Sequence, residues 1–439
     1  METENAVLNA EKGYCGNVSL SSSDGREEEG RMAKLLVIAD DLTGALDSGV
    51  QLAGKGDRVL VSLDMEGGLV HAPEADVLVI DSESRHDTPE VAYQKVGRLV
   101  SEGLANGVLR IYKKTDSGLR GNVGAELAAV IDASGASHLN FVPAYPKQRR
   151  TTKQGIHCVD GQPLAKSVFA ADPVNPVVCS KVSDLIHLQS DVAVQSWAGE
   201  VGTDGIVVFD CTTDDDMAGI ATWLCENDFD APMAGCAGLL EMLPRCSSEA
   251  APRQGYATLN PRLVVVSGSV NAITSAQLDE GESRGAHRVH LPIKSILANG
   301  WTAAEASAFV NETIAAAGSN PVVLIDTLGD HLCKEELDCV ATRKISDAAG
   351  LCASVVSKRA GHTTMVVGGD ALVGFVHQVE ATLLEPVDEL FPGIVVARYE
   401  GSKASGTLIT KSGAFGNVGL FHEIHQALVE KAEGELSCR

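Results

Sequence analysis

Short runs of apolar residues, separated by longer stretches with helical spacing, recur along the chain from Lys34 onward. Such runs are typical of strands buried on both faces of a parallel sheet, with helices covering each face. The first series is Leu35–Ala39, Val59–Leu63, Val77–Asp81, Val108–Tyr112, Leu139–Val142 and Ile206–Phe209. The second series is Leu263–Val266, Val289–Leu291, Val322–Ile325 and Met365–Val367. The pattern predicts an α/β fold of two α/β domains with mainly parallel sheets facing across a cleft.

The length of the chain supports two domains, because 439 residues exceed what one hydrophobic core usually serves. A polar stretch at 247–261 separates the two series of strands and is interpreted as the linker. The first domain is expected over 33–246 and the second over 262–439. Residues 1–32 are Ser-rich and then acidic, so we expect a disordered tail, or an over-extended start with Met32 as the initiator.

Composition narrows the classes of partner. A formal net charge of −24 repels nucleic acid and anionic membranes, so neither is expected to bind. The 11 cysteines are scattered without a CxxC pair, which favours reduced thiols in a cytoplasmic protein over a disulfide scaffold or zinc site. No run approaches the ~18 apolar residues of a membrane span, and no signal-peptide pattern is present. A small anionic ligand would need local cations and backbone N–H groups.

Two carboxylates follow the first predicted strand, in Ala39-Asp-Asp-Leu-Thr-Gly44. In parallel sheets the ligand site lies beyond the carboxyl ends of the strands. Asp40 and Asp41 are therefore candidates for binding a metal or for accepting a proton from a substrate hydroxyl. The alternative is that one of them only caps the following helix.

Cations follow two further strands of the first series. Arg85 comes shortly after Val77–Asp81 and could hold a carboxylate in a two-pronged geometry, although it could also be a surface loop residue. The segment from Lys113 to Arg120 could face an anion, or could be a solvated charged loop. Its candidate substrate-binding residues are Lys113, Lys114, Thr115, Asp116 and Arg120. Asp116 would stay ionised among these cations and competes with Asp40 and Asp41 as catalytic base.

Small-residue turns follow strands of the second series. Glycine turns between a strand and a helix leave backbone N–H groups free for phosphate, although such turns also occur as plain packing. The candidate mononucleotide-binding residues are Ser267, Ser269, Gly368, Gly369, Asp370, Ala371, Lys411, Ser412 and Gly413. Neither GxxxxGK[ST] nor a GxGxxG in the first strand–helix unit is present, so a P-loop enzyme and a common dinucleotide fold are not expected.

These motifs, in this order, resemble those of the four-carbon acid sugar kinase family, long known as a domain of unknown function. The resemblance extends from Lys34 to Leu420. It rests on Ala39-Asp-Asp-Leu-Thr-Gly44, Lys114-Thr-Asp-Ser117 with Arg120-Gly121, Pro143-Ala-Tyr-Pro146, Gly368-Gly-Asp370 and Lys411-Ser-Gly413. Two positions depart from it, since Leu42 stands where Phe is frequent and Ala371 where Thr or Ser is common.

The resemblance implies an N-terminal sugar-acid domain and a C-terminal nucleotide domain. It places Asp41, Arg85 and the segment 113–116 at the substrate, and Ser267, the segment 368–371 and Gly413 at ATP. It further implies phosphorylation of the terminal 4-hydroxyl of D-threonate, D-erythronate or a 3-oxo-tetronate. The run from Asp47 to Leu52 is more similar to the threonate and erythronate branches.

The resulting hypothesis is an ATP-dependent kinase that phosphorylates D-threonate or D-erythronate. Mg²⁺ would neutralise the phosphates, as phosphoryl transfer generally requires, and its protein ligands stay unassigned. The alternatives are a 3-oxo-tetronate 4-kinase, a non-catalytic sugar-acid sensor on the same fold, and an enzyme using the cleft for carbonyl or hydrolytic chemistry. A homodimer is compatible with the sequence.

Overall fold

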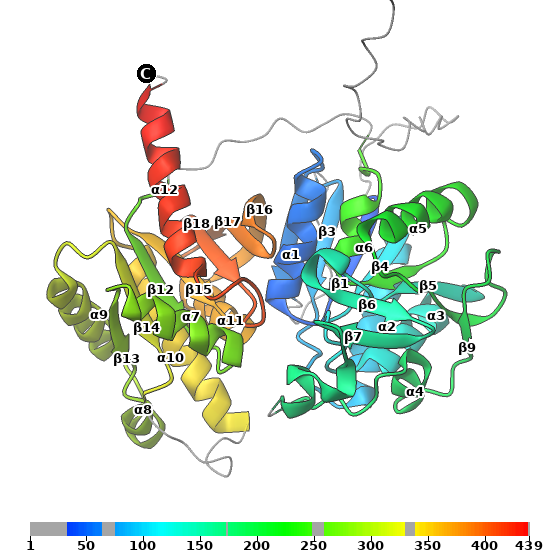
Figure 1. Ribbon diagram of the computed structural model, residues 1–439, viewed down its shortest axis with the longest axis horizontal. Coiled ribbons are helices and arrows are strands. Elements are labelled where there is room, and N and C mark those ends of the chain that lie inside the picture. Colours follow the sequence, from blue (N-terminus) through cyan, green and yellow to red (C-terminus); the bar gives the residue numbers. More distant parts are fainter. Residues whose placement is uncertain (1–32, 64–74, 173, 248–258, 330–338, 438–439) are drawn as a thin grey trace, which may run out of the picture.

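The structure is a computed structural model that describes residues 33–63, 75–172, 174–247, 259–329 and 339–437. The described chain forms two α/β halves that lie side by side (Figure 1). The predicted tail at 1–32 and most of the predicted linker, residues 248–258, lie outside the described residues.

The elements of the two halves follow in chain order. The N-terminal half contains β1 (Leu35–Ala39), α1 (Leu42–Ala53), β2 (Val59–Leu63), β3 (Val77–Asp81), α2 (Pro89–Ala105), β4 (Arg110–Lys114), α3 (Val123–Ser134), β5 (His138–Val142), β6 (Arg150–Lys153), β7 (Ile156–Val159), β8 (Gln162–Pro163), α4 (Val182–His187), β9 (Val194–Ser196), β10 (Gly205–Val208), α5 (Asp214–Asn227), β11 (Met233–Gly235) and α6 (Ala237–Met242). The C-terminal half contains β12 (Leu263–Ser267), α7 (Ala272–Ser283), β13 (His287–His290), α8 (Ile293–Asn299), α9 (Ala303–Ala317), β14 (Val322–Asp326), α10 (Cys339–Ser357), β15 (Thr363–Val367), α11 (Gly369–Val379), β16 (Ala381–Phe391), β17 (Ile394–Gly401), β18 (Ser405–Lys411) and α12 (Leu420–Ser437).

Each apolar run predicted as a strand overlaps one, which confirms the α/β class. The largest error in the bounds is at β4, which was predicted at Val108–Tyr112 but runs from Arg110 to Lys114. Three parts of the sheet were not predicted. The strands β9 and β11 have only three residues each, and β16, β17 and β18 form an antiparallel unit.

The prediction of two separate sheets is wrong. Within the described residues the strands form one 15-stranded sheet, in the order β13-β14-β12-β15-β18-β17-β16-β2-β3-β1-β4-β11-β5-β10-β9. The two parallel parts meet through β16, which pairs antiparallel with β2 at Leu383↔Ser62 and Leu384↔Val61. The halves are thus joined edge to edge by backbone hydrogen bonds. A small three-stranded sheet, β6-β7-β8, lies beside the N-terminal half.

Helices cover both faces of this sheet, as the apolar strands require. In β1, the side chains of Leu35 and Val37 enter one core and those of Leu36 and Ile38 enter another, because successive strand residues point to opposite faces. The core on the first face is shared by the two halves, since it contains residues of α1, α5 and α6 together with residues of α8, α9, α10 and α11. On the other face, α2, α3 and α4 cover the N-terminal half, and α7 and α12 cover the C-terminal half.

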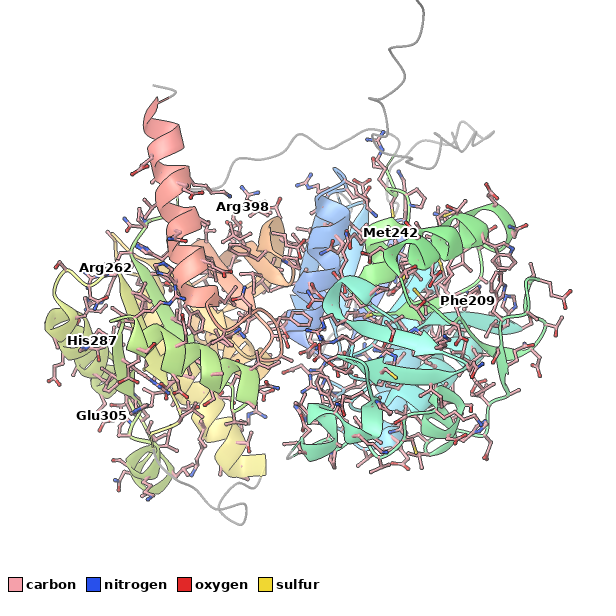
Figure 2. All side chains as sticks on the ribbon, viewed as in Figure 1. Phe209, Met242, Arg262, His287, Glu305 and Arg398 are labelled. Atoms are coloured by element: carbon pink, nitrogen blue, oxygen red, sulfur yellow. The ribbon has the colours of Figure 1, made fainter. Side chains whose placement is uncertain are left out.

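Side chains fill the space between the sheet and its helices in both halves (Figure 2). Phe209, which follows β10, stacks on Trp197 with ring centroids 5.0 Å apart. None of the helices in the described ranges combines the length and apolar character that crossing a membrane demands.

Helix α1 lies where the two halves meet and is buried on all sides from Leu42 to Leu52. Small residues allow this close approach. A Cβ atom at Gly49 would lie 3.0 Å from the Pro386 ring of β16 and 3.2 Å from Val59 of β2. The helix therefore packs against the strand pair that joins the halves.

Two helix-interior glycines form a matched test of the packing behind α11. A Cβ atom at Gly350 of α10 would collide with the backbone of Gly374 in α11, whereas a Cβ atom at Gly219 of α5 would meet nothing within 4 Å. We expect Gly350→Ala to cost about 1–3 kcal/mol through overpacking and to lower Tm by roughly 2–8 °C. Gly219→Ala should leave Tm unchanged or raise it, because alanine favours the helix. Equal shifts in thermal denaturation of the two variants would contradict this close packing.

Candidate functional site

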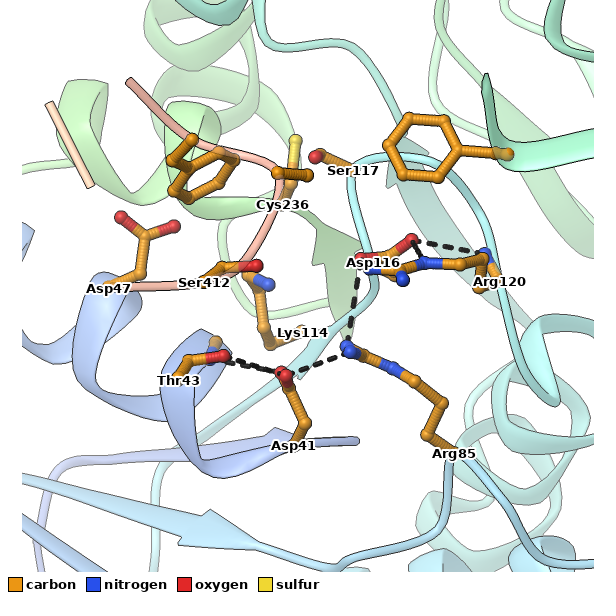
Figure 3. A pocket seen from close by; sticks show the side chains of 14 residues that line it. Asp41, Thr43, Asp47, Arg85, Lys114, Asp116, Ser117, Arg120, Cys236 and Ser412 are labelled. Atoms are coloured by element: carbon orange, nitrogen blue, oxygen red, sulfur yellow. Dashed lines mark hydrogen bonds and ion pairs between the residues drawn. The ribbon is translucent and has the colours of Figure 1, made fainter. Parts of the chain in front are cut away.

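Three neighbouring strands of the N-terminal half, in the order β3-β1-β4, end at the same edge of the sheet. The predicted motifs that follow them therefore meet there. A pocket at this edge is lined by Asp41, Thr43, Gly44, Asp47, Arg85, Lys114, Asp116, Ser117, Arg120, Phe169, Cys236, Ser412, Ala414 and Phe415 (Figure 3). The last three residues follow β18, so both halves of the molecule contribute to the pocket.

Asp41 caps α1 and also reaches into the pocket. Its Oδ1 accepts a hydrogen bond from the Gly44 backbone N–H at 3.0 Å, as the capping interpretation predicted. Its Oδ2 accepts from the Thr43 hydroxyl and from Arg85 Nη1, each at 2.8 Å. Burial would raise the pKa of Asp41, but Arg85 and Lys114 hold this pKa below its usual value.

Arg85 is surrounded by three carboxylates. Its Nε donates to Asp40 Oδ2 at 2.6 Å, its Nη1 donates to Asp41, and its Nη2 lies 3.7 Å from Asp116 Oδ1. Burial would lower the pKa of Arg85, but these carboxylates raise it well above its usual value. Asp40 is buried and does not line the pocket, so its role here is to orient the guanidinium.

Asp116 is held by several donors at once. Arg120 donates from Nε to Oδ2 and from Nη2 to Oδ1, both at 2.9 Å. The backbone N–H groups of Gly118 and Arg120 also donate to Oδ2. Burial would raise the pKa of Asp116, but Arg120 and Arg85 hold it far below the usual value. A carboxylate with so low a pKa is a weak proton acceptor.

The two adjacent lysines point in opposite directions. Because β4 extends to Lys114, successive side chains leave the sheet on opposite faces. Lys114 lines the pocket. Lys113 is completely buried and forms an ion pair with Glu126 Oε2 of α3 at 3.0 Å. Lys113 and Thr115, which is also buried, were predicted to bind substrate, but neither lines the pocket.

The predicted nucleotide motifs also meet, at the ends of the neighbouring strands β12, β15 and β18. Gly368 has φ +104°, and a Cβ atom there would lie 3.4 Å from the backbone nitrogen of Ser269. A Cβ atom at Gly413 would collide with the hydroxyl of Ser269. Glycine at these two positions lets the three turns touch. Ala371 packs its methyl group toward Gly268, so a hydroxyl side chain would be crowded there.

Lys411, at the end of β18, is 1% exposed. Its ammonium donates to the Thr274 hydroxyl at 3.2 Å and to the Ser412 carbonyl oxygen at 2.9 Å. Both partners are uncharged, and burial lowers the pKa of Lys411 to about 7. An anion such as phosphate would stabilise the charged form.

The two groups of motifs come into contact, although they lie in opposite halves of the chain. A Cβ atom at Gly369, the first residue of α11, would lie 3.2 Å from Asp41 Oδ2 and 3.7 Å from the Thr43 hydroxyl. His86 Nε2 lies 3.8 Å from Asp370 Oδ1 across the same junction. The first turns of α1 and α11 thus converge, and unpaired N–H groups at a helix start favour anions.

Several pocket residues were not identified as candidates from the sequence. These are Thr43, Gly44, Asp47, Ser117, Phe169, Cys236, Ala414 and Phe415. Thr43, Asp47 and Ser117 lie in or beside motifs that had been singled out, so proximity was an available signal. Cys236 follows the short strand β11, and Phe169 lies in a short 3₁₀ helix, Val168–Ala171, so no pattern pointed to either. In the described part of the chain, no three His, Cys, Asp or Glu side chains form a metal-binding group.

Comparisons with known proteins agree with this division into halves. A sugar-binding N-terminal domain matches residues 35–243, and a nucleotide-binding C-terminal domain matches residues 264–421. The chain belongs to the four-carbon acid sugar kinase family.

Individual relatives and a solved structure are consistent with this family. D-threonate kinase of Salmonella typhimurium is 35% identical over 57% of this chain and 62% of that protein, so the match spans less than two thirds of the relative. D-erythronate kinase of Heliobacterium modesticaldum is 29% identical over 88% of this chain and 95% of that protein. A crystal structure from Salmonella typhimurium LT2, described provisionally as a tRNA synthase, has a TM-score of 0.70 and 22% identity. The match covers 90% of this chain and 99% of the chain in that crystal structure, and it supports the fold alone.

The ion pair between Lys113 and Glu126 predicts a pH-dependent loss of stability. Burial raises the pKa of Glu126, with Lys113 opposing this effect. Lys113→Met should leave a buried carboxylate without its cation and cost about 3–5 kcal/mol at pH 8. The loss should shrink at pH 5.5, because Glu126 then takes up a proton more easily.

Thermal denaturation of Lys113→Met at both pH values measures this effect. The double variant Lys113→Met/Glu126→Gln is the control, since it removes both charges and should recover most of the lost Tm at pH 8. A single variant as stable as the wild type at pH 8 would show that the ion pair contributes nothing.

Proposed function

We propose that this protein transfers the γ-phosphoryl group of ATP to the terminal 4-hydroxyl of a four-carbon sugar acid, D-threonate or D-erythronate in the first instance. One observation carries the proposal. A single pocket is lined by cations from the sugar-binding half and by the turn after β18 from the nucleotide-binding half. Phosphoryl transfer requires this arrangement, because the acceptor hydroxyl and the γ-phosphate must meet in one enclosed site.

The sugar acid would bind through its carboxylate to Lys114, on the side of the pocket where Arg120 lies. Arg85 is already bound by Asp40 and Asp41. Arg120 is likewise bound by Asp116 and Asp172. Both guanidinium groups therefore support the site mainly by keeping these carboxylates ionised. Lys114 influences the ionisation of Asp41 and Asp116 from inside the pocket. A bound carboxylate would therefore lie beside the Lys114 ammonium in spite of the acidic chain.

ATP would place its phosphates at the turns after β12, β15 and β18 and at the first turn of α11. The crowded glycine turns and the buried ammonium of Lys411 fit such a ligand, because close backbone approach and an unneutralised cation both favour phosphate. Mg²⁺ would neutralise charge on the phosphates. Magnesium in such sites needs only one or two carboxylates besides phosphate oxygens, and Asp370, exposed at the start of α11, would supply one.

A coupled assay for ADP with ATP·Mg²⁺ and a panel of four-carbon acids tests the proposal. We expect turnover with D-threonate or D-erythronate. Turnover with 3-oxo-tetronates alone would move the chain to that branch of substrates. Binding of a tetronate by calorimetry without ADP formation would instead identify a sensor, and absence of both would refute the sugar-acid assignment.

Lys114→Met tests the proposed carboxylate site. Losing one charge-assisted hydrogen bond costs about 1.5–3 kcal/mol, so KM for the sugar acid should rise roughly tenfold to hundredfold. KM for ATP should change little, because Lys114 belongs to the opposite half. Steady-state kinetics with each substrate varied separately measures both values, and a larger effect on ATP would contradict the placement of the carboxylate.

A further inference from the structure

Asp47 is a polar residue on a helix that is buried on every side, and polar groups in such positions normally have hydrogen-bond partners. The neighbouring polar residues of α1 follow this rule. Ser48 donates to the Gly44 carbonyl oxygen at 2.8 Å, and Gln51 donates to Glu389 Oε1 at 3.1 Å. Asp47 is 4% exposed, and its Oδ1 is buried without a partner among the described residues. Because Asp47 also lines the pocket, the missing partner is expected to be a ligand.

The burial of Asp47 favours its protonated form. Burial raises the pKa of Asp47 to about 7, with Lys114 opposing, and Glu389, Asp41 and Glu241 adding to the rise. These groups come from β4, β16, the start of α1 and α6. A base works best when its pKa lies near the working pH, since it is then both available and strong enough to take a proton.

The other pocket carboxylates are less suited to this task. Asp116 accepts hydrogen bonds from Arg120 on both oxygens, and Asp41 caps α1 with one oxygen and binds Thr43 and Arg85 with the other. Taking a proton would require either group to give up a cation. Both have a pKa below the usual value, so each would be a weak base.

The position of Asp47 fits the end of the substrate that reacts. Asp47 and Gln51 are one turn apart on α1, and the bond from Gln51 to Glu389 shows that this face turns toward β16 of the nucleotide-binding half. Figure 3 shows Asp47 and Arg120 on opposite sides of the pocket, with Lys114 between them. A sugar acid whose carboxylate binds Lys114 and lies on the Arg120 side of the pocket would therefore direct its far hydroxyl toward Asp47.

We propose that Asp47 is the general base that accepts the proton of the substrate's terminal hydroxyl, an inference that rests on the kinase function proposed above. As the hydroxyl oxygen bonds to the γ-phosphorus, its O–H bond breaks and the proton moves to the Asp47 carboxylate. The bond between the γ-phosphorus and the β,γ-bridging oxygen breaks, and ADP leaves with the bonding electrons. The proton later passes from Asp47 to solvent, which restores the base.

Asp47→Asn is the first test, with wild-type enzyme, ATP·Mg²⁺ and whichever tetronate the wild type phosphorylates. The amide keeps the shape of the side chain but cannot accept the proton. We expect kcat to fall about 10²–10⁴-fold, while KM for both substrates and Tm change little. Ser48→Ala, a change at the next residue of the same buried helix, should keep kcat close to that of the wild type.

The pH dependence supplies a second readout that a structural role would not produce. In the wild type, kcat/KM should rise with pH through about 7, because Asp47 must lose its proton to act. Glu389→Gln removes one of the repelling charges while keeping an acceptor for Gln51 and for the backbone N–H of Gly393. The acidic limb should then move to lower pH, and kcat at its plateau should be retained.

The outcomes separate this inference from the proposed function. A wild type that phosphorylates a tetronate, together with an Asp47→Asn variant that keeps kcat within about threefold, overturns the role of Asp47 and leaves the kinase intact. An acidic limb that does not move in Glu389→Gln also overturns it. A wild type without turnover on any tetronate refutes the kinase function and the base with it. If Asp47→Asn fails to fold, the shift in Glu389→Gln still decides.

Discussion

The burial of α1 between the two halves is the constraint on which the rest of the structure depends. A helix surrounded on all sides has little room for bulky residues. A Cβ atom at Gly44 would crowd Asp41 and Lys114, and one at Gly49 would crowd Pro386. At the start of the helix, Asp41 accepts a hydrogen bond from the backbone N–H of Gly44. Because α1 packs against both β2 and β16, it sets where the sugar-binding half and the nucleotide-binding half meet. The pocket lies at that meeting point.

Buried charge explains how the remaining residues divide the work. In a chain of net charge −24, a site for two anions needs cations that the protein does not neutralise completely. Arg85 and Lys113 are bound to carboxylates and stabilise the site from behind. Lys114 and Lys411 are directed toward the pocket and toward the phosphate turns, where an anionic ligand would complete their environment. The same cost of isolated charge raises the pKa of Asp47 to about 7.

Much of the sheet was predictable because buried parallel strands have a direct signature in the sequence. The ten apolar runs were located, and the polar residues after β1, β3, β12 and β15 were recognised as the edge where ligands bind. The unit of β16, β17 and β18 was not predicted. β16 contains Pro386 and acidic residues, which disfavour a strand, whereas the apolar run at 394–397 in β17 was a signal that was missed. The joining of the two sheets was therefore not predicted either, because it depends on pairing between residues such as Leu384 and Val61 that are far apart in the chain.

The sequence by itself determined which residue types lie at the strand ends, because local apolar runs and glycine turns decide where strands stop. It did not determine the direction of each side chain. Because β4 continues through Lys114 and does not end at Tyr112, Lys113 and Lys114 leave the sheet on opposite faces. Lys113 forms a buried ion pair and Lys114 lines the pocket. Likewise, Asp47 looked like one polar residue of a helix. Only the tertiary structure brings Glu389 and Glu241 close to it from distant elements. Its pKa is set by burial and by charges that are near in space but not in sequence.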